Sequence, residues 1–364
     1  MIGEKGPSRR DFLQLAGGAT FALAGGGSLG ALLEACGAAN TAAPKPTAAD
    51  VSALYAAAKK DSKLVWYTAQ FELTQAQAVV AAFKAKFPGV DVDLTRQTSQ
   101  IIAQRTLQDF DKGAYTIDVV GTADEGNFVE FKKKGALLAY TPPDVDLLPQ
   151  KFQNLDKDGT YFTSALALII ISYSTKLVSD PPKVWKDMLD SKWSGKITLG
   201  HPAYSGQVLN WVLAVVNKYG WSYFQDMAKL NPKIGRSIND TLTDLKSGER
   251  QIGASAASVA LGRKAQGDPV DVRYPDDFTV LVVQPQAVLK NAPHPNAAKL
   301  FQNFTFSKEL SQVESDTYQP PIRTDVQGPS GMDLEKIKTV RVDVDTLTKG
   351  LTEAKAKWRE IMGV

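Results

Sequence analysis

The 364-residue chain has one cysteine, Cys36, and two histidines, His201 and His294. A single cysteine forms no internal disulfide, so packing must hold the fold. Beyond its first 36 residues, the sequence has no H-E-x-x-H, C-x-x-C, P-loop or G-x-S-x-G pattern. Zinc, nucleotide and serine-hydrolase chemistry therefore lack their residues, and we predict a binding protein rather than an enzyme. A secreted enzyme that uses paired carboxylates remains an alternative, because a sequence does not show their geometry.

The chain also lacks a strong excess of charge. Lysine and arginine number 42 against 39 aspartates and glutamates, which gives a net charge of +3. Nucleic-acid binding needs a concentrated basic face, so we expect no such partner. After Cys36 no apolar run is long enough to cross a membrane, and the remaining chain is long enough for two lobes with separate cores.

The first 36 residues have the pattern of an export signal. Arg9 and Arg10 precede a weakly apolar stretch, Phe12 to Leu33, which is typical of the twin-arginine route. Its many glycines argue against a transmembrane helix. Gly25 to Gly30 fit G-x-G-x-x-G, but no strand precedes them and export would remove them. We predict export to the periplasm or to the outer face of the cytoplasmic membrane.

Cys36 stands where a lipoprotein signal places its acylated residue. Leu33 and Ala35 suit a lipobox, whereas Glu34 is unusual inside one. Two alternatives follow: lipidation of Cys36, which we favour, or ordinary cleavage near Ala35 that leaves a soluble protein. Residues 37–50, rich in alanine and proline, are expected to be a tether.

Strand-like and helix-like segments alternate through the rest of the chain, which predicts an α/β fold with a mainly parallel sheet. We expect lobe 1 to comprise residues 51–170 plus 279–364, with the C-terminal helices packing on either lobe, and lobe 2 to comprise residues 171–278. The chain would cross between lobes near 168–175 and 276–284, which gives a two-crossover hinge. A cleft between two lobes is the expected small-molecule site. The expected strands are 64–68, 90–94, 117–121, 166–172, 196–200, 251–255, 278–283 and 287–289, and the expected helices are 51–60, 72–87, 101–113, 125–134, 182–189, 206–219, 221–230, 241–247, 259–266, 295–306 and 345–362.

The segment from Gly200 to Gly206 joins a predicted strand to a predicted helix. Ser205 can cap that helix, and Gly206 lets a ligand approach the backbone. Free N–H groups and the helix dipole would then bind an anion, with Tyr204 adding a hydroxyl or a ring face. An ordinary capped helix start explains the same residues.

Three further loops follow strands whose carboxyl ends should meet at one sheet edge. Arg96 is the best single partner for an anion, although most arginines are simply exposed. Asp124 could equally cap the next helix. The candidate binding residues of these loops are Ala69, Gln70, Arg96, Thr98, Ser99, Thr122, Ala123 and Asp124, to which Tyr173, Asn239 and Asp240 add contacts from the second lobe.

The order of several motifs resembles the periplasmic solute-binding proteins of ABC importers, in the branch related to ferric-iron-binding proteins. The matching segments include residues 65–69, 118–120, 134–137, 193–197, 201–206, 247–249, 267–270, 292–298 and 320–323. The resemblance implies a type II periplasmic binding protein fold, whose two lobes close on a ligand that is passed to a membrane permease and its ATPase. We expect no cofactor and a monomer.

Iron-binding members of that family use an adjacent tyrosine pair, and phenolates suit ferric ion. Here Ala257 and Ser258 occupy the corresponding places, and no two of the 11 tyrosines are adjacent. The resemblance therefore implies a small organic or phosphorylated anion, which Ser258 would help to bind, and no metal. A ferric-iron or iron-chelate protein remains an alternative, as does a ligand sensor for a membrane receptor. We expect Ser205→Ala and Arg96→Ala each to weaken binding at least about tenfold, because each removes a charge-assisted contact.

Overall fold

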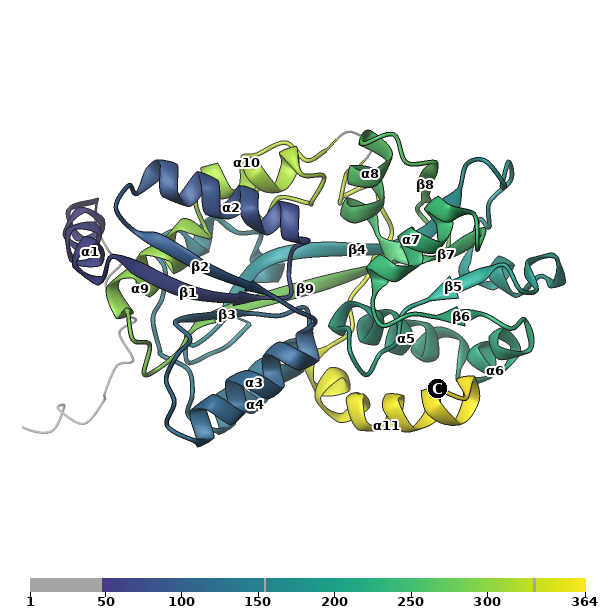
Figure 1. The fold of residues 1–364 in the computed structure, drawn as a ribbon, viewed down its shortest axis with the longest axis horizontal. Helices are drawn as coiled ribbons and strands as arrows, with labels where there is room; N and C mark the ends of the chain where they lie inside the picture. The colour runs from purple at the N-terminus through teal and green to yellow at the C-terminus, as the bar shows by residue number, and fades with distance from the viewer. Residues whose placement is uncertain (1–47, 154, 330–331) are drawn as a thin grey trace, which may run out of the picture. The chain divides into compact units, whose positions relative to one another are not determined.

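A long mixed β-sheet runs through the part of the chain that the computed structural model describes, residues 48–153, 155–329 and 332–364. The predicted signal, Cys36 and residues 37–47 of the predicted tether lie outside the described residues. The strands are β1 (Lys63–Thr68), β2 (Asp91–Arg96), β3 (Val119–Gly121), β4 (Phe162–Ser174), β5 (Ile197–Leu199), β6 (Lys233–Ile234), β7 (Ile252–Ala256), β8 (Val270–Arg273), β9 (Thr279–Val288) and β10 (Thr339–Val340). They lie in the order β2-β1-β3-β9-β4-β7-β5-β6, while β10 pairs with β9 and β8 with β4 (Figure 1).

Two long strands, β4 and β9, occupy the middle of this sheet (Figure 1). Residues 162–169 of β4 pair antiparallel with residues 280–286 of β9, and residues 169–173 continue antiparallel along β7. The expected parallel pairing holds for β1 with β2 and β3, and for β5 with β6 and β7. It is wrong for β4 and β9, because they run antiparallel to each other, β9 runs antiparallel to β3, and β4 runs antiparallel to β7 and β8. Of the described strands, only the short β10 pairs parallel with β9.

Both strands are longer than their apolar runs predicted. Every residue of β9 is buried, and all but one of β4, because helices cover both faces of the sheet. An apolar run without alternation does not mark where such a strand begins or ends. The expected strands 278–283 and 287–289 are consequently one strand, and the expected strand 166–172 is extended at both ends.

Helices pack on both faces of the sheet. Figure 1 shows α2 and α10 on one face near β1 and β2, with α3 and α4 on the opposite face. The helices are α1 (Ala48–Asp61), α2 (Leu73–Lys86), α3 (Ser99–Asp111), α4 (Glu125–Lys133), α5 (Gly206–Tyr219), α6 (Ser222–Lys229), α7 (Ile238–Ser247), α8 (Ala257–Ala265), α9 (Pro295–Phe304), α10 (Lys308–Asp316) and α11 (Val344–Met362). Short 3-10 turns cover Val145–Leu147, Gln150–Phe152, Trp185–Leu189 and Ser191–Trp193. Among the described residues, none of the helices is both long and apolar enough to cross the bilayer.

The helix α11 belongs to the core of the end of the sheet that contains β5 and β7. Its Leu347, Ala354 and Trp358 are buried in the largest apolar cluster. The Trp358 ring centroid lies 5.2 Å from that of Phe224 on α6. Burial of one large apolar side chain stabilises a fold by about 1.5–3 kcal/mol, so α11 is a structural part of this end. It packs against α5 and α6 there and also against α4.

Three local expectations were wrong. The expected helix 182–189 is only the 3-10 turn Trp185–Leu189, which follows Pro181 and Pro182. The helix α1 begins at Ala48, so the last three residues of the expected tether are helical. The helix α10 was missed because most of its residues are polar. The division into two lobes remains a prediction.

Candidate functional site

Ser205 caps the N-terminus of α5. Its Oγ accepts a hydrogen bond of 3.4 Å from the backbone N–H of Val208, and the helix begins at Gly206 as expected. The cap satisfies one of the free donors of the first turn, while the helix dipole leaves partial positive charge at this end. The capping role is thus confirmed, and anion binding at the same place stays a prediction.

Gly206 packs directly against the loop that follows β3. A Cβ atom at position 206 would lie 2.7 Å from the backbone carbonyl of Ala123 and 2.8 Å from Cβ of Asp124. The amide of Asn210, one turn along α5, donates to the carbonyl oxygen of Ala123 at 3.2 Å. The structure therefore brings three predicted residues, Ala123, Asp124 and Gly206, into contact, and only glycine fits at position 206.

The loop after β3 is fixed by its own polar side chains. The Thr122 hydroxyl donates to the backbone carbonyl of Asp124 at 3.0 Å and accepts from the Asn127 amide at 3.2 Å. Ser99, the first residue of α3, accepts a hydrogen bond of 3.2 Å from the N–H of Ala123. These predicted residues position the loop against α5, so their observed role is structural.

Asp124 is buried between α3, α4 and the start of α5, with 1% of its surface exposed. Its Oδ1 caps α4 by accepting from the Gly126 N–H at 3.0 Å, and its Oδ2 accepts from the Gln100 amide at 2.8 Å. Burial removes the carboxylate from water and raises its pKa to about 6, against the opposing effects of Gln100, Gly126 and Lys355. This carboxyl group therefore titrates near neutral pH.

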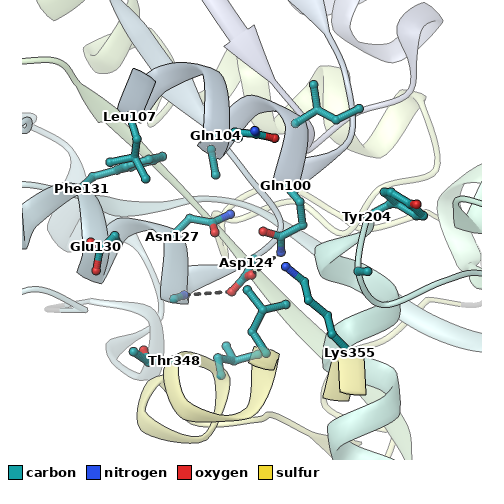
Figure 2. A pocket seen from close by; sticks show the side chains of 16 residues that line it. Gln100, Gln104, Leu107, Asp124, Asn127, Glu130, Phe131, Tyr204, Thr348 and Lys355 are labelled. Carbon is teal, nitrogen blue, oxygen red and sulfur yellow. Dashed lines mark hydrogen bonds between the residues drawn. The ribbon is translucent and has the colours of Figure 1, made fainter. Parts of the chain in front are cut away.

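A cleft of about 520 Å³ opens beside Asp124. Figure 2 shows the side chain of Lys355, from α11, reaching toward Asp124 and Gln100. The volume lies within the usual range for small-molecule sites. Residues from α3, α4, α11 and the loop before α5 form its wall: Gln100, Ile101, Ala103, Gln104, Leu107, Asp124, Gly126, Asn127, Glu130, Phe131, Ala203, Tyr204, Leu347, Thr348, Leu351 and Lys355.

Tyr204 is the second predicted residue in this wall. Its ring is 40% exposed and lies 5.1 Å from the His201 ring, between centroids. The guanidinium of Arg236 lies 5.4 Å from the centre of the Tyr204 ring. The carbonyl oxygen of Tyr204 accepts a hydrogen bond of 3.3 Å from the N–H of Gln100. The ring is thus available to a solute from its exposed side.

Arg96 has partners other than a ligand. Its guanidinium donates to Glu72 Oε1 and to the carbonyl oxygen of Phe71, both at 3.0 Å. Gln70 is buried against the central strands and donates to Ser164 Oγ at 2.6 Å. Both side chains therefore support the loop after β1, which includes the buried Ala69.

The remaining predicted residues are spread over other elements. Tyr173 lies in β4 opposite Ile252 and Asp271. Asp240 accepts hydrogen bonds from backbone N–H groups just before α7, and the distance from the nitrogen of Arg236 to Asp240 Oδ2 is 2.6 Å. Ser258 lines a second cleft of about 540 Å³ between α2 and α8. Thr98 Oγ1 and Asn239 Oδ1 are buried and have no hydrogen-bond partner among the described residues.

Six polar residues of the cleft were not predicted: Gln100, Gln104, Asn127, Glu130, Thr348 and Lys355. Gln100 and Asn127 lie inside amphipathic helices, and the sequence does not show whether a polar side chain of such a helix faces solvent or a cleft. Lys355 follows Asp124 by more than two hundred positions, and nothing in its sequence neighbourhood indicates the packing of α11 beside α4. Their role follows only from the tertiary fold.

The position that the sequence resemblance aligns with the tyrosine pair of iron-binding proteins opens α8 in this chain. Ala257 and Ser258 are the first two residues of that helix, directly after β7. In the described ranges, no three histidine, cysteine, aspartate or glutamate side chains are grouped so that they could hold a metal ion. The polar side chains of the cleft in Figure 2 are three amides, two carboxyl groups, two hydroxyls and one ammonium, a mixed set that suits an organic solute.

Comparisons with solved structures identify the fold. AfuA from Actinobacillus pleuropneumoniae, a periplasmic binding protein, is 20% identical, with a TM-score of 0.74 over 83% of this chain and 99% of that one. Iron-bound HitA from Pseudomonas aeruginosa is also 20% identical, with a TM-score of 0.70 over 82% of this chain and 99% of that one. The fold is therefore that of the type II periplasmic binding proteins, as expected.

Sequence comparison identifies the family. An uncharacterised protein of Haemophilus influenzae is 23% identical over 226 residues, which are 58% of this chain and 65% of that protein. The profile of the bacterial extracellular solute-binding proteins matches residues 64–313. Proteins of this family bind small solutes outside the cytoplasm. With this match over more than half of its length, the chain belongs to the bacterial extracellular solute-binding protein family.

Proposed function

We propose that this protein captures a small organic or phosphorylated anion between two lobes and passes it to the permease of an ABC importer. The observation that carries the proposal is the capped N-terminus of α5, which faces the loop after β3 beside a solute-sized cleft. The loop and α5 come from distant parts of the chain and meet at Gly206. A solute that touched both would favour the arrangement in which they are close.

The physical basis for an anion is the charge at this junction. The first N–H groups of α5 and the helix dipole attract negative charge, and the ammonium of Lys355 reaches toward Asp124 and Gln100 (Figure 2). A charge-assisted hydrogen bond contributes roughly 1.5–3 kcal/mol, so two such contacts support micromolar affinity only when the solute also buries apolar surface. The apolar residues in the cleft wall would supply that surface.

The similar structures contain solutes of different kinds. The AfuA structure contains fructose-6-phosphate and the HitA structure contains iron. Because the tyrosine pair is replaced by Ala257 and Ser258, the anion is the better proposal for this chain. The remaining predictions belong to the same proposal: the two-lobe division, twin-arginine export, lipid anchoring at Cys36, a permease and ATPase as partners, and a monomeric state.

Native mass spectrometry tests the proposal. The protein comprising residues 37–364, which lacks Cys36, would be measured as purified and after partial unfolding and refolding. A small organic or phosphorylated anion that disappears on refolding is the expected result. A bound ferric ion would contradict the proposal, because oxygen ligands other than a tyrosine pair would then hold the metal.

A further inference from the structure

The cleft beside Asp124 carries charges of both signs. Lys355 supplies one positive charge, whereas Asp124 and Glu130 supply two carboxyl groups. Figure 2 shows Glu130 at the opposite side of the drawn cleft from Lys355. A phosphate ester with two negative charges would meet one cation and two acids here. Its electrostatic balance in this cleft is therefore unfavourable.

We propose that the solute of this cleft is a small zwitterion with an apolar side group, an amino acid or dipeptide in chemical class. Its carboxylate would face Lys355 and its ammonium group would face Glu130. This inference rests on the proposed function, the capture of a solute with an anionic group, and specifies a carboxylate whose charge is balanced by an ammonium group on the same molecule. Burial raises the pKa of Asp124 to about 6, so at mildly acidic pH this carboxyl group adds less negative charge to the cleft.

The neutral polar groups of the cleft suit such a solute. Gln100, Gln104 and Asn127 each offer an amide with donors and an acceptor, and these line the wall between the two charged ends. Amides can hydrogen-bond a carboxylate, an ammonium group or a peptide bond without adding charge. The amides would therefore orient the solute, while the two ionised side chains would select the sign of the charge at each of its ends.

The rest of the wall is apolar. It consists of side chains from α3, α4 and α11, namely Ile101, Leu107, Phe131, Leu347 and Leu351. An aliphatic or aromatic side group would bury its surface there, at roughly 25 cal/mol for each Å² removed from water. A sugar phosphate has no comparable apolar part. Charge and apolar surface thus indicate the same class of solute.

The first test is calorimetric titration of the full-length protein with leucine, phenylalanine and leucyl-leucine. At least one of these should bind. Its N-acetyl form, which lacks the cation, and its amide form, which lacks the anion, should each bind at least about tenfold more weakly, because each loses one charged contact. Glycerol 3-phosphate should not compete. Binding of none of the three zwitterions, or equal binding of the N-acetyl form, would overturn the inference.

The second test shows which side chain contacts each charged end of the solute. Lys355→Gln should lower the affinity for the zwitterion at least about tenfold. Lys349→Gln, on the exposed side of α11, should leave that affinity unchanged. Glu130→Gln should lower the affinity for the zwitterion but not the affinity for its N-acetyl form. An unchanged affinity in both Lys355→Gln and Glu130→Gln would overturn the inference. If mass spectrometry finds an anion without an amine, the proposed function holds and only this inference fails.

Discussion

The side-chain amide of Asn210 on α5 donates a hydrogen bond of 3.2 Å to the backbone carbonyl of Ala123, in the loop after β3. The same amide donates to the carbonyl oxygen of Gly206 at 2.9 Å, so one buried side chain ties the start of α5 to a loop that precedes it by more than eighty residues. This connection links the two segments that the proposed function brings together around a solute.

Removal of this amide should destabilise the protein. Asn210→Ala leaves the Ala123 carbonyl buried without its partner, which costs about 1–3 kcal/mol. Chemical denaturation of the purified protein measures the change in the free energy of unfolding. Asn217→Ala, at an exposed position of the same helix, is the matched control and should have little effect. Equal losses in both variants would contradict a stabilising role for the hydrogen bond between Asn210 and the loop after β3.

Gly206→Ala should weaken solute binding. The added Cβ would lie 2.7 Å from the Ala123 carbonyl, so α5 and the loop must move apart, at an overpacking cost of about 1–3 kcal/mol. Titration calorimetry with the solute found by mass spectrometry gives the affinity. Gly262→Ala serves as control, since its Cβ meets only one atom, at 4.0 Å. Full affinity in Gly206→Ala would mean that the contact is absent from the binding form.

Ser205→Ala should affect both stability and binding. Loss of the cap removes the hydrogen bond to Val208 and costs about 0.5–2 kcal/mol in unfolding free energy. If the hydroxyl also binds the solute, affinity falls at least about tenfold. Ser205→Asp restores a capping oxygen but adds negative charge, so it should recover stability and not affinity. Recovery of both would argue against anion binding at α5.

The stability of the protein should depend on pH through Asp124. Its pKa is about 6 in the fold and 3.8 ordinarily, so the native state holds a proton that the unfolded state loses first. Stability from this group is therefore fully present below pH 4 and is lost as pH rises toward 6, by about 3 kcal/mol in total. Asp124→Asn should remove that dependence, because an amide does not titrate.

Thermal unfolding from pH 4 to pH 8 measures this effect as the difference between Asp124→Asn and the parent protein. The comparison is necessary because burial also raises the pKa of Glu125 and of Glu314. Those two carboxyl groups are present in both proteins, and their contributions cancel. A difference that stays constant over the whole pH range would contradict the assignment of the titration to Asp124.

Much of the fold followed from local patterns. Strand β1 ends at Thr68 and helix α5 begins at Gly206, as expected, because apolar periodicity and a serine cap act within a few residues. The antiparallel course of β4 and β9 could not be predicted in this way. Strand direction depends on which distant segments pair, and an apolar run such as residues 165–171 is the same in either direction.

The site was harder to predict than the fold. Asp124 and Tyr204 were expected from their places after strands or before a helix, and both line the cleft. Arg96 was also expected in the site, but the structure pairs it with Glu72, whose sequence position gives no sign of that contact. Lys355 was missed because its role requires that α11 pack beside α4. Contacts between distant segments therefore account for both differences.

The placement of α11 has a consequence for how the chain matures. Trp358 packs against Phe224, and Lys355 completes the cleft beside Asp124. A nascent chain that has emerged from the ribosome only as far as residue 343 exposes the apolar surface that these residues cover. The cleft does not yet exist at that stage. The wall of the cleft is therefore complete only after α11 has been translated, and until then the apolar surface that α11 covers stays exposed.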